Sequence, residues 1–188
     1  MKGALLAWIV FECLGVSFVQ SPSPQDFALA NATTRRLPPS AFPNLPTKIR
    51  TELDRRRCSI PQTFIGGSRH NVIQGHFRNG DQVDWAILCS RDRVSTILVF
   101  WGGEPRAVTA LAPKPDADFL QTVSRTEIGF SRAITVASKE SILEHYKRHG
   151  GVKPPPLAHA GIEDAFVEKA SVVWYRHQGM WLQLTGSD

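Results

Sequence analysis

Most of the features that would reveal a function directly are missing from this sequence. No Lys/Arg-rich face alternates with aromatic residues, which argues against nucleic acid as a partner despite a net charge of +5. No apolar run reaches the roughly 20 residues that a transmembrane helix needs. Cysteines number only three. The composition, with 42% hydrophobic and 21% charged residues, is that of an ordinary globular protein and excludes a disordered or fibrous chain.

Catalytic and metal-binding motifs are absent too. The Gly-Gly-Ser at residues 66–68 lacks the strand–turn–helix setting of a nucleophile elbow. His145 and His149 share a helix face, as zinc ligands do, but no glutamate stands between them as in H-E-x-x-H. We interpret this pair as solvated residues at a helix end. The sequence therefore predicts no metal ion and no cofactor.

The most motif-like stretch spans residues 75–88 and resembles an FG-GAP unit, in which a strand leads into a calcium loop. Calcium prefers oxygen ligands at alternate loop positions, but these positions hold His76, Arg78, a glycine and a glutamine, and only Asp84 matches. We therefore expect His76, Asp81 and Asp84 to form a structural turn. The alternative is a small hydrolase that uses His76 with Asp81 or Asp84 as an acid–base pair.

The first residues have the form of an export signal. Lys2 precedes an apolar run at residues 4–11, and the small residues Gly15 and Ser17 fit a cleavage site. We predict a signal peptide at 1–17, a proline-rich spacer without helix or strand at 18–46, and one globular domain at 47–188.

Cleavage after Ser17 would remove Cys13 and leave Cys58 and Cys89. Two cysteines in an exported protein predict one disulfide. Two buried thiols, or one reactive thiol, are the alternatives.

The hydrophobic pattern predicts an α+β domain, in which two or three helices pack on an antiparallel sheet of about five to seven strands. Residues 84–90 are apolar on both alternating faces, which is typical of a central strand covered on both sides. Ser138 is suited to cap a helix with Ile142, Leu143 and Tyr146 on its buried face. Further strands are expected at 72–77, 96–101, 107–111, 134–137, 172–176 and 180–184, and further helices at 47–57 and 161–170.

The domain as a whole resembles predicted exported bacterial proteins of unassigned activity, on residues 57–62, 84–89, 161–164, 169–171 and 179–182. This resemblance implies export to the periplasm or the cell exterior and implies no mechanism. We expect a non-catalytic domain that binds a macromolecule or an envelope component. A hydrolase and a structural or assembly element are the alternatives.

Overall fold

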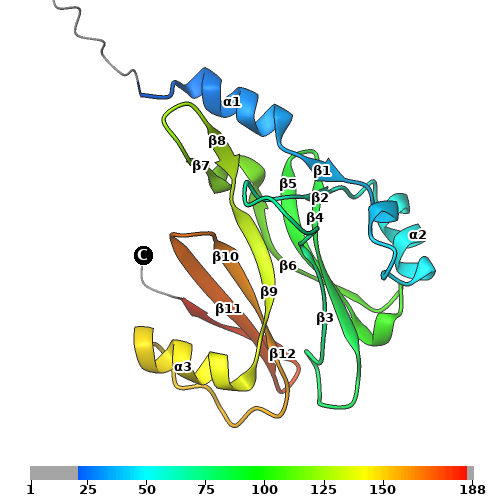
Figure 1. Cartoon of the computed structure of the whole chain (residues 1–188). Helices are drawn as coiled ribbons and strands as arrows, with labels where there is room; N and C mark the ends of the chain where they lie inside the picture. The colour runs from blue at the N-terminus through cyan, green and yellow to red at the C-terminus, as the bar shows by residue number, and fades with distance from the viewer. Residues whose placement is uncertain (1–20, 186–188) are drawn as a thin grey trace, which may run out of the picture.

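The computed structural model describes residues 21–185, so the predicted signal peptide at 1–17 lies outside the described residues. Within that range the chain forms twelve strands in four antiparallel sheets and three α-helices (Figure 1). The predicted α+β class is confirmed. The prediction of one sheet with about five to seven strands is wrong, because the strands are divided between two four-stranded sheets and two two-stranded ones.

The first four-stranded sheet is a meander in which each strand pairs with the next along the chain. Its strands are β3 (Val72–Gly75), β4 (Asp84–Arg91), β5 (Val94–Phe100) and β6 (Val108–Pro115). Side chains of β4 alternate between two cores. Ala86 and Leu88 belong to one core, and Ile87 and Cys89 belong to the other. The prediction of a central strand covered on both faces is therefore confirmed.

The second four-stranded sheet has the order β12-β11-β10-β9. Its strands are β9 (Arg132–Ala137), β10 (Gly161–Phe166), β11 (Ala170–His177) and β12 (Met180–Thr185), and α3 (Lys139–His149) connects β9 to β10. The helix predicted at 161–170 is wrong, because this segment pairs with β9 and β11 on both sides. A Cβ atom at Gly161 would lie 2.5 Å from the Trp174 carbonyl oxygen, a close approach of neighbouring backbones that glycine permits.

Three cores divide the molecule into four layers, helix, sheet, sheet and helix (Figure 1). The first core lies between the two large sheets. The second packs α2 (Thr47–Arg55) on the outer face of the first sheet through Ile49 and Leu53. The third packs α3 on the outer face of the second sheet through Ile142. Ser138 caps α3 as predicted, because its hydroxyl accepts the Ser141 amide at 3.1 Å.

The stretch predicted to be a spacer without helix or strand contains both, so this prediction is wrong. It includes α1 (Pro24–Thr33) and β1 (Arg36–Leu37). Ser23 and Asp26 form a capping box at the start of α1, and Pro24 occupies the first helical position, where a missing N–H is tolerated. Residues that follow, Phe42 and Leu45, are buried in the second core.

The small sheets complete the fold around these layers. They pair β1 with β2 (Ile60–Pro61), and β7 (Leu120–Thr122) with β8 (Ile128–Phe130). Short 3-10 turns lie at Pro39–Ala41, Trp101–Gly103 and Asp116–Phe119. Among residues 21–185, no helix is long and apolar enough to cross a membrane.

Candidate functional site

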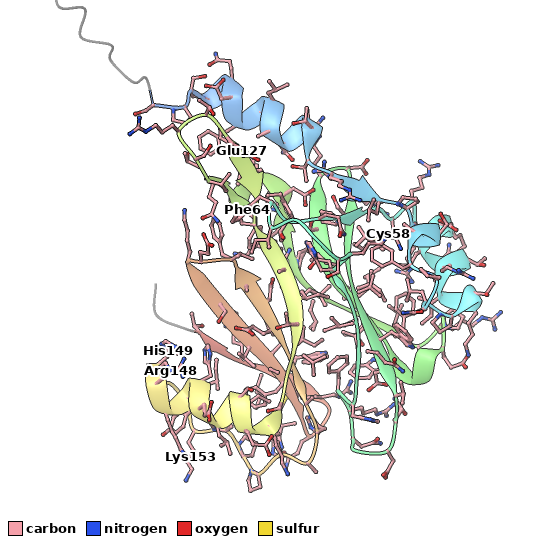
Figure 2. The ribbon with its side chains drawn as sticks, in the orientation of Figure 1. Cys58, Phe64, Glu127, Arg148, His149 and Lys153 are labelled. Carbon is pink, nitrogen blue, oxygen red and sulfur yellow. A yellow bond between two sulfur atoms is a disulfide. The ribbon has the colours of Figure 1, made fainter. Side chains whose placement is uncertain are left out.

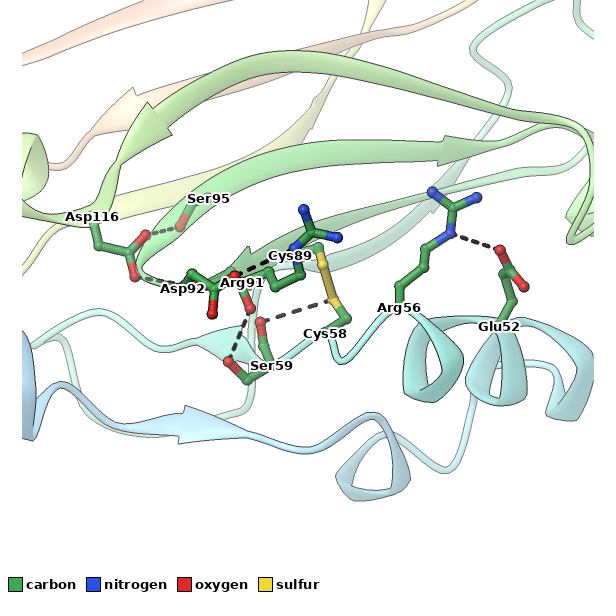
Figure 3. Close-up of a disulfide and its surroundings, with 10 residues drawn as sticks. Glu52, Arg56, Cys58, Ser59, Cys89, Arg91, Asp92, Ser95 and Asp116 are labelled. Atoms are coloured by element: carbon green, nitrogen blue, oxygen red, sulfur yellow. Dashed lines mark hydrogen bonds and ion pairs between the residues drawn. A yellow bond between two sulfur atoms is a disulfide. The ribbon is translucent and has the colours of Figure 1, made fainter.

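The predicted disulfide is confirmed. Cys58 and Cys89 are bonded, with their Cα atoms 5.3 Å apart (Figure 3). Cys58 follows α2 and Cys89 lies in β4, and both residues are buried in the second core. Beside the bridge, the backbones of Ser59 and Ser90 exchange two hydrogen bonds of 3.0 and 2.8 Å. The disulfide thus fastens the end of α2 to the first sheet.

Of the residues predicted to form a turn, His76 and Asp81 lie in the connection between β3 and β4, and Asp84 is the first residue of β4. Asp84 is fully buried. Its carboxylate accepts the amides of Phe77 at 3.1 Å and Gly102 at 2.8 Å and the side-chain amide of Gln82 at 2.5 Å. His76 is exposed, and its Nδ1 lies 2.8 Å from a backbone carbonyl oxygen, that of Gln82.

Asp81 is exposed as well, and its backbone amide donates to Asn79 at 3.2 Å. No hydrogen bond within residues 21–185 joins His76 to Asp81 or to Asp84. The three residues therefore lie in one hairpin, at its connection and at the start of β4, without forming an acid–base pair.

A second group of charged residues is buried between the sheets. Arg132 is fully buried, and its guanidinium donates to both carboxylate oxygens of Asp164 at 2.9 and 2.8 Å. Asp116, also fully buried, accepts hydrogen bonds from Ser95 and from Arg36. Each of these charges has a charged partner, and Arg132 and Asp116 make further hydrogen bonds, which stabilise a buried charge. We interpret this group as structural.

A hollow of about 480 Å³ lies where three connections meet at one end of the molecule. It is lined by residues 78–80 between β3 and β4, by 156–159 between α3 and β10, and by 176–179 at the turn from β11 to β12. We call it the three-turn pocket. The Ala160 amide donates to the His76 carbonyl at 2.9 Å and so ties two of the connections together. Gln178 and Gly179 both have positive φ, at 47° and 82°, as the tight hairpin turn requires.

The charged groups that line the three-turn pocket can carry only positive charge. They are Arg78, His159, Arg176 and His177, and none of the described lining residues is acidic. Arg78 and Arg176 take part in no ion pair among residues 21–185. Arginine presents a fork of N–H donors that matches carboxylate and phosphate oxygens. Chemically, the pocket can therefore hold an anionic group.

The side chain of Arg176 is restrained by an aromatic ring. Its guanidinium carbon lies 4.6 Å from the centre of the Trp101 ring, within the range of a cation–π interaction. The Trp101 ring is in turn packed 5.7 Å from the Trp181 ring, and Trp181 pairs with Arg176 across β11 and β12. A side chain restrained in this way loses less conformational entropy when it binds a ligand.

Another basic hollow lies near the disulfide, at the opposite end of β4 (Figure 3). Its lining includes residues 55–57 and Arg91. Here acidic neighbours pair with three of the four lining arginines, and Arg57 is the remaining one. Glu52 accepts hydrogen bonds from Arg55 at 2.8 Å and from Arg56 at 2.7 Å, and the Arg55 hydrogen bond is the main reason that the pKa of Glu52 falls to about 2. Asp92 lies 3.7 Å from Arg91. This arginine hollow is therefore a weaker candidate for binding an anion.

Comparison with known protein families, curated proteins and solved structures finds no match. Within residues 21–185, no group of three histidine, cysteine or acidic side chains is arranged to hold a metal ion. The rings of His145 and His149 lie 4.8 Å apart, and burial lowers the pKa of His145.

Sequence reasoning missed the three-turn pocket, although each of its parts carried a signal. The strands expected at 172–176 and 180–184 leave residues 177–179 as a connection, and those expected at 72–77 and 84–90 leave Arg78 in another. His159 precedes the element expected at 161–170. What the sequence lacked was any sign that these three connections meet.

Proposed function

We propose that this chain is an exported, non-catalytic binding domain and that its three-turn pocket holds an anionic group of an envelope component. The observation that carries the proposal is the lining of the pocket, where two arginines and two histidines meet without an acidic residue among the described lining. The net charge of +5 supports it, because a basic protein attracts anionic partners over a range set by ionic strength.

Binding of inorganic pyrophosphate, followed by amide chemical shifts in NMR, tests the pocket directly. We expect shifts concentrated at residues 78–80, 156–159 and 176–179. Arg78→Gln together with Arg176→Gln should weaken binding about a hundredfold, as loss of two charge-assisted contacts of about 1.5 kcal/mol each would do. Arg125→Gln is the matched control, because Arg125 is exposed in the turn between β7 and β8.

Shifts spread evenly over the basic surface, or centred on residues 55–57 and 91, would contradict the proposal. Either result would place the anion at the arginine hollow or at no defined site.

Export is the second part of the proposal. It is supported by the form of residues 1–17 and by the disulfide, since disulfides persist in oxidising compartments. Intact-mass analysis of the protein recovered from an exporting host should give a chain that begins at Phe18. A mass that still includes Met1 or Lys2 would contradict it.

The hydrolase alternative gains no support from the geometry. Both carboxylate oxygens of Asp84 are occupied by hydrogen bonds from neighbouring amides, and His76 faces a backbone carbonyl oxygen. His76→Ala should leave pyrophosphate binding unchanged.

A further inference from the structure

A second hollow shares a wall with the three-turn pocket. It has a volume of about 470 Å³ and is lined by Leu143 of α3, by neighbouring residues of that helix, and by residues 153–157. We call it the apolar cleft. Pro156 and Leu157 line both the cleft and the three-turn pocket. The basic hollow and the apolar one therefore share the wall formed by Pro156 and Leu157.

Leu143 departs from the predicted packing of α3. Ile142 is fully buried and Tyr146 packs on the third core, as predicted, whereas 40% of Leu143 is exposed. Its side chain instead lines the cleft, opposite three consecutive prolines. Single exposed apolar side chains are common, but an apolar side chain that faces other apolar groups across a hollow is typical of a ligand-binding surface.

The rim of the apolar cleft is mostly basic. Lys153 and Lys139 both line it, and Figure 2 shows Lys153 at the lower end of the molecule, beneath α3. The single acidic residue among its described lining, Glu140, lies 3.6 Å from the Lys139 ammonium. An occupant of the cleft would thus meet apolar walls and, beside the Lys139–Glu140 pair, the cation of Lys153.

On the basis of the proposed function, we infer that the three-turn pocket and the apolar cleft bind one ligand, a single-chain acidic lipid. Its phosphate or carboxylate head lies between Arg78 and Arg176, and its acyl chain crosses Pro156 and Leu157 into the cleft beside Leu143. The two hollows have opposite chemistry and a shared wall, which complements an amphiphile with one charged end. A small anion without a chain would leave the cleft empty.

Binding of monomeric lysophosphatidic acid, below its micelle concentration, tests this inference against two partial ligands. Glycerol 3-phosphate has the head without the chain, and a monoacylglycerol of equal length has the chain without the charge. We expect lysophosphatidic acid to bind at least tenfold more tightly than either. Lengthening the chain should raise affinity by up to about fourfold per methylene, as burial of an apolar CH₂ predicts, until the cleft is full.

Two single variants separate the halves of the site. Leu143→Ser should weaken lysophosphatidic acid binding at least fivefold and leave glycerol 3-phosphate unaffected. Arg78→Gln should weaken both ligands. Leu29→Ser is the matched control for the first variant, because Leu29 is 63% exposed on α1. Unchanged melting temperatures would show that both variants fold.

Each contrary result has a distinct meaning. If glycerol 3-phosphate binds as tightly as the lipid, the lipid inference is overturned and the anion-binding proposal stands. If monoacylglycerol binds as tightly as lysophosphatidic acid, and Arg78→Gln has no effect, the anion-binding proposal fails and so does the inference that rests on it. Binding to anionic vesicles without binding to monomeric lipid would replace the pocket with a membrane-surface contact.

Discussion

Replacing Arg132 by methionine removes a fully buried charge that makes four hydrogen bonds. Besides the two bonds to Asp164, its guanidinium donates to the carbonyl oxygens of Ser95 at 2.8 Å and Ala112 at 2.7 Å. Its guanidinium carbon also lies 4.7 Å from the centre of the Phe119 ring. The arginine thereby joins β9 and β10 of the second sheet to β5 and β6 of the first.

The magnitude follows from what the substitution leaves behind. Methionine is apolar and fills part of the volume, so the main loss is electrostatic. The Asp164 carboxylate, whose side chain is 9% exposed, would be left without its cation, and breaking a buried pair in this way costs about 3–5 kcal/mol of stability. For a chain of this size, the melting temperature should fall by roughly 6–20 °C.

A double-mutant cycle tests the reasoning. Urea unfolding should show that Arg132→Met combined with Asp164→Leu is more stable than Arg132→Met alone, because the double variant holds no unpaired charge. Arg125→Met, at an exposed position, should change stability by less than about 0.5 kcal/mol. A loss below about 1 kcal/mol in Arg132→Met would refute the assignment of Arg132 as a structural link, since breaking a buried ion pair costs several times more. Failure of the second substitution to rescue it would show that lost packing and the lost hydrogen bonds to the Ser95 and Ala112 carbonyls, not the unpaired carboxylate, dominate.

Three further perturbations have defined outcomes. Replacing Cys58 and Cys89 by alanine should lower stability by about 3–4 kcal/mol, because the bridge closes a loop between residues 31 apart; urea unfolding in the oxidised and reduced states measures it, and equal midpoints would contradict it. Asp84→Ala should cost about 2–3 kcal/mol, since its buried carboxylate accepts two backbone amides and one side-chain amide, whereas His76→Ala should cost much less, and thermal melts compare the two. The pKa of Glu52 is lowered to about 2 in the folded chain from an ordinary 4.5, so the stability that this carboxylate adds is present above pH 4.5 and is lost as the pH falls toward 2. Glu52→Gln should therefore destabilise the protein at pH 7 and have no effect near pH 2, and a stability difference that does not depend on pH would contradict this.

Patterns with a local cause were predicted correctly. The strand β4 was predicted because a short run that is apolar on both faces is typical of a strand covered on both sides. The helix α3 was predicted because Ser138 offers a cap and the glycines at 150 and 151 end the pattern. The disulfide was predicted because Cys58 and Cys89 are the two cysteines that remain after the predicted cleavage.

Patterns whose outcome depends on distant partners were predicted wrongly. The spacing of Ile162, Ala165 and Phe166 suits a helix, but the segment inserts between β9 and β11 and forms β10. The segment of α1 was predicted to be a spacer because of its prolines, although the sequence also shows a capping box that begins at Ser23. The first error arises because tertiary pairing overrides local preference, and no local reading corrects it. The second was avoidable, because proline is favoured at the first helical position.

The distribution of acidic and basic residues in the fold explains why the three-turn pocket was not predicted from the sequence. Acidic residues draw attention as catalytic groups, yet Asp84, Asp116 and Asp164 are hydrogen-bonded within the fold, and arginines pair with the last two. These pairs add nothing to the net charge, so the surplus of +5 belongs to cations elsewhere. Arg78 and Arg176 are such cations, and they lie in connections 98 residues apart. Connections that are far apart in the chain meet only through the packing of the two sheets, and no local sequence pattern encodes that packing. The chemistry of the three-turn pocket, in contrast, follows from arginines that have no acidic partner among the described residues.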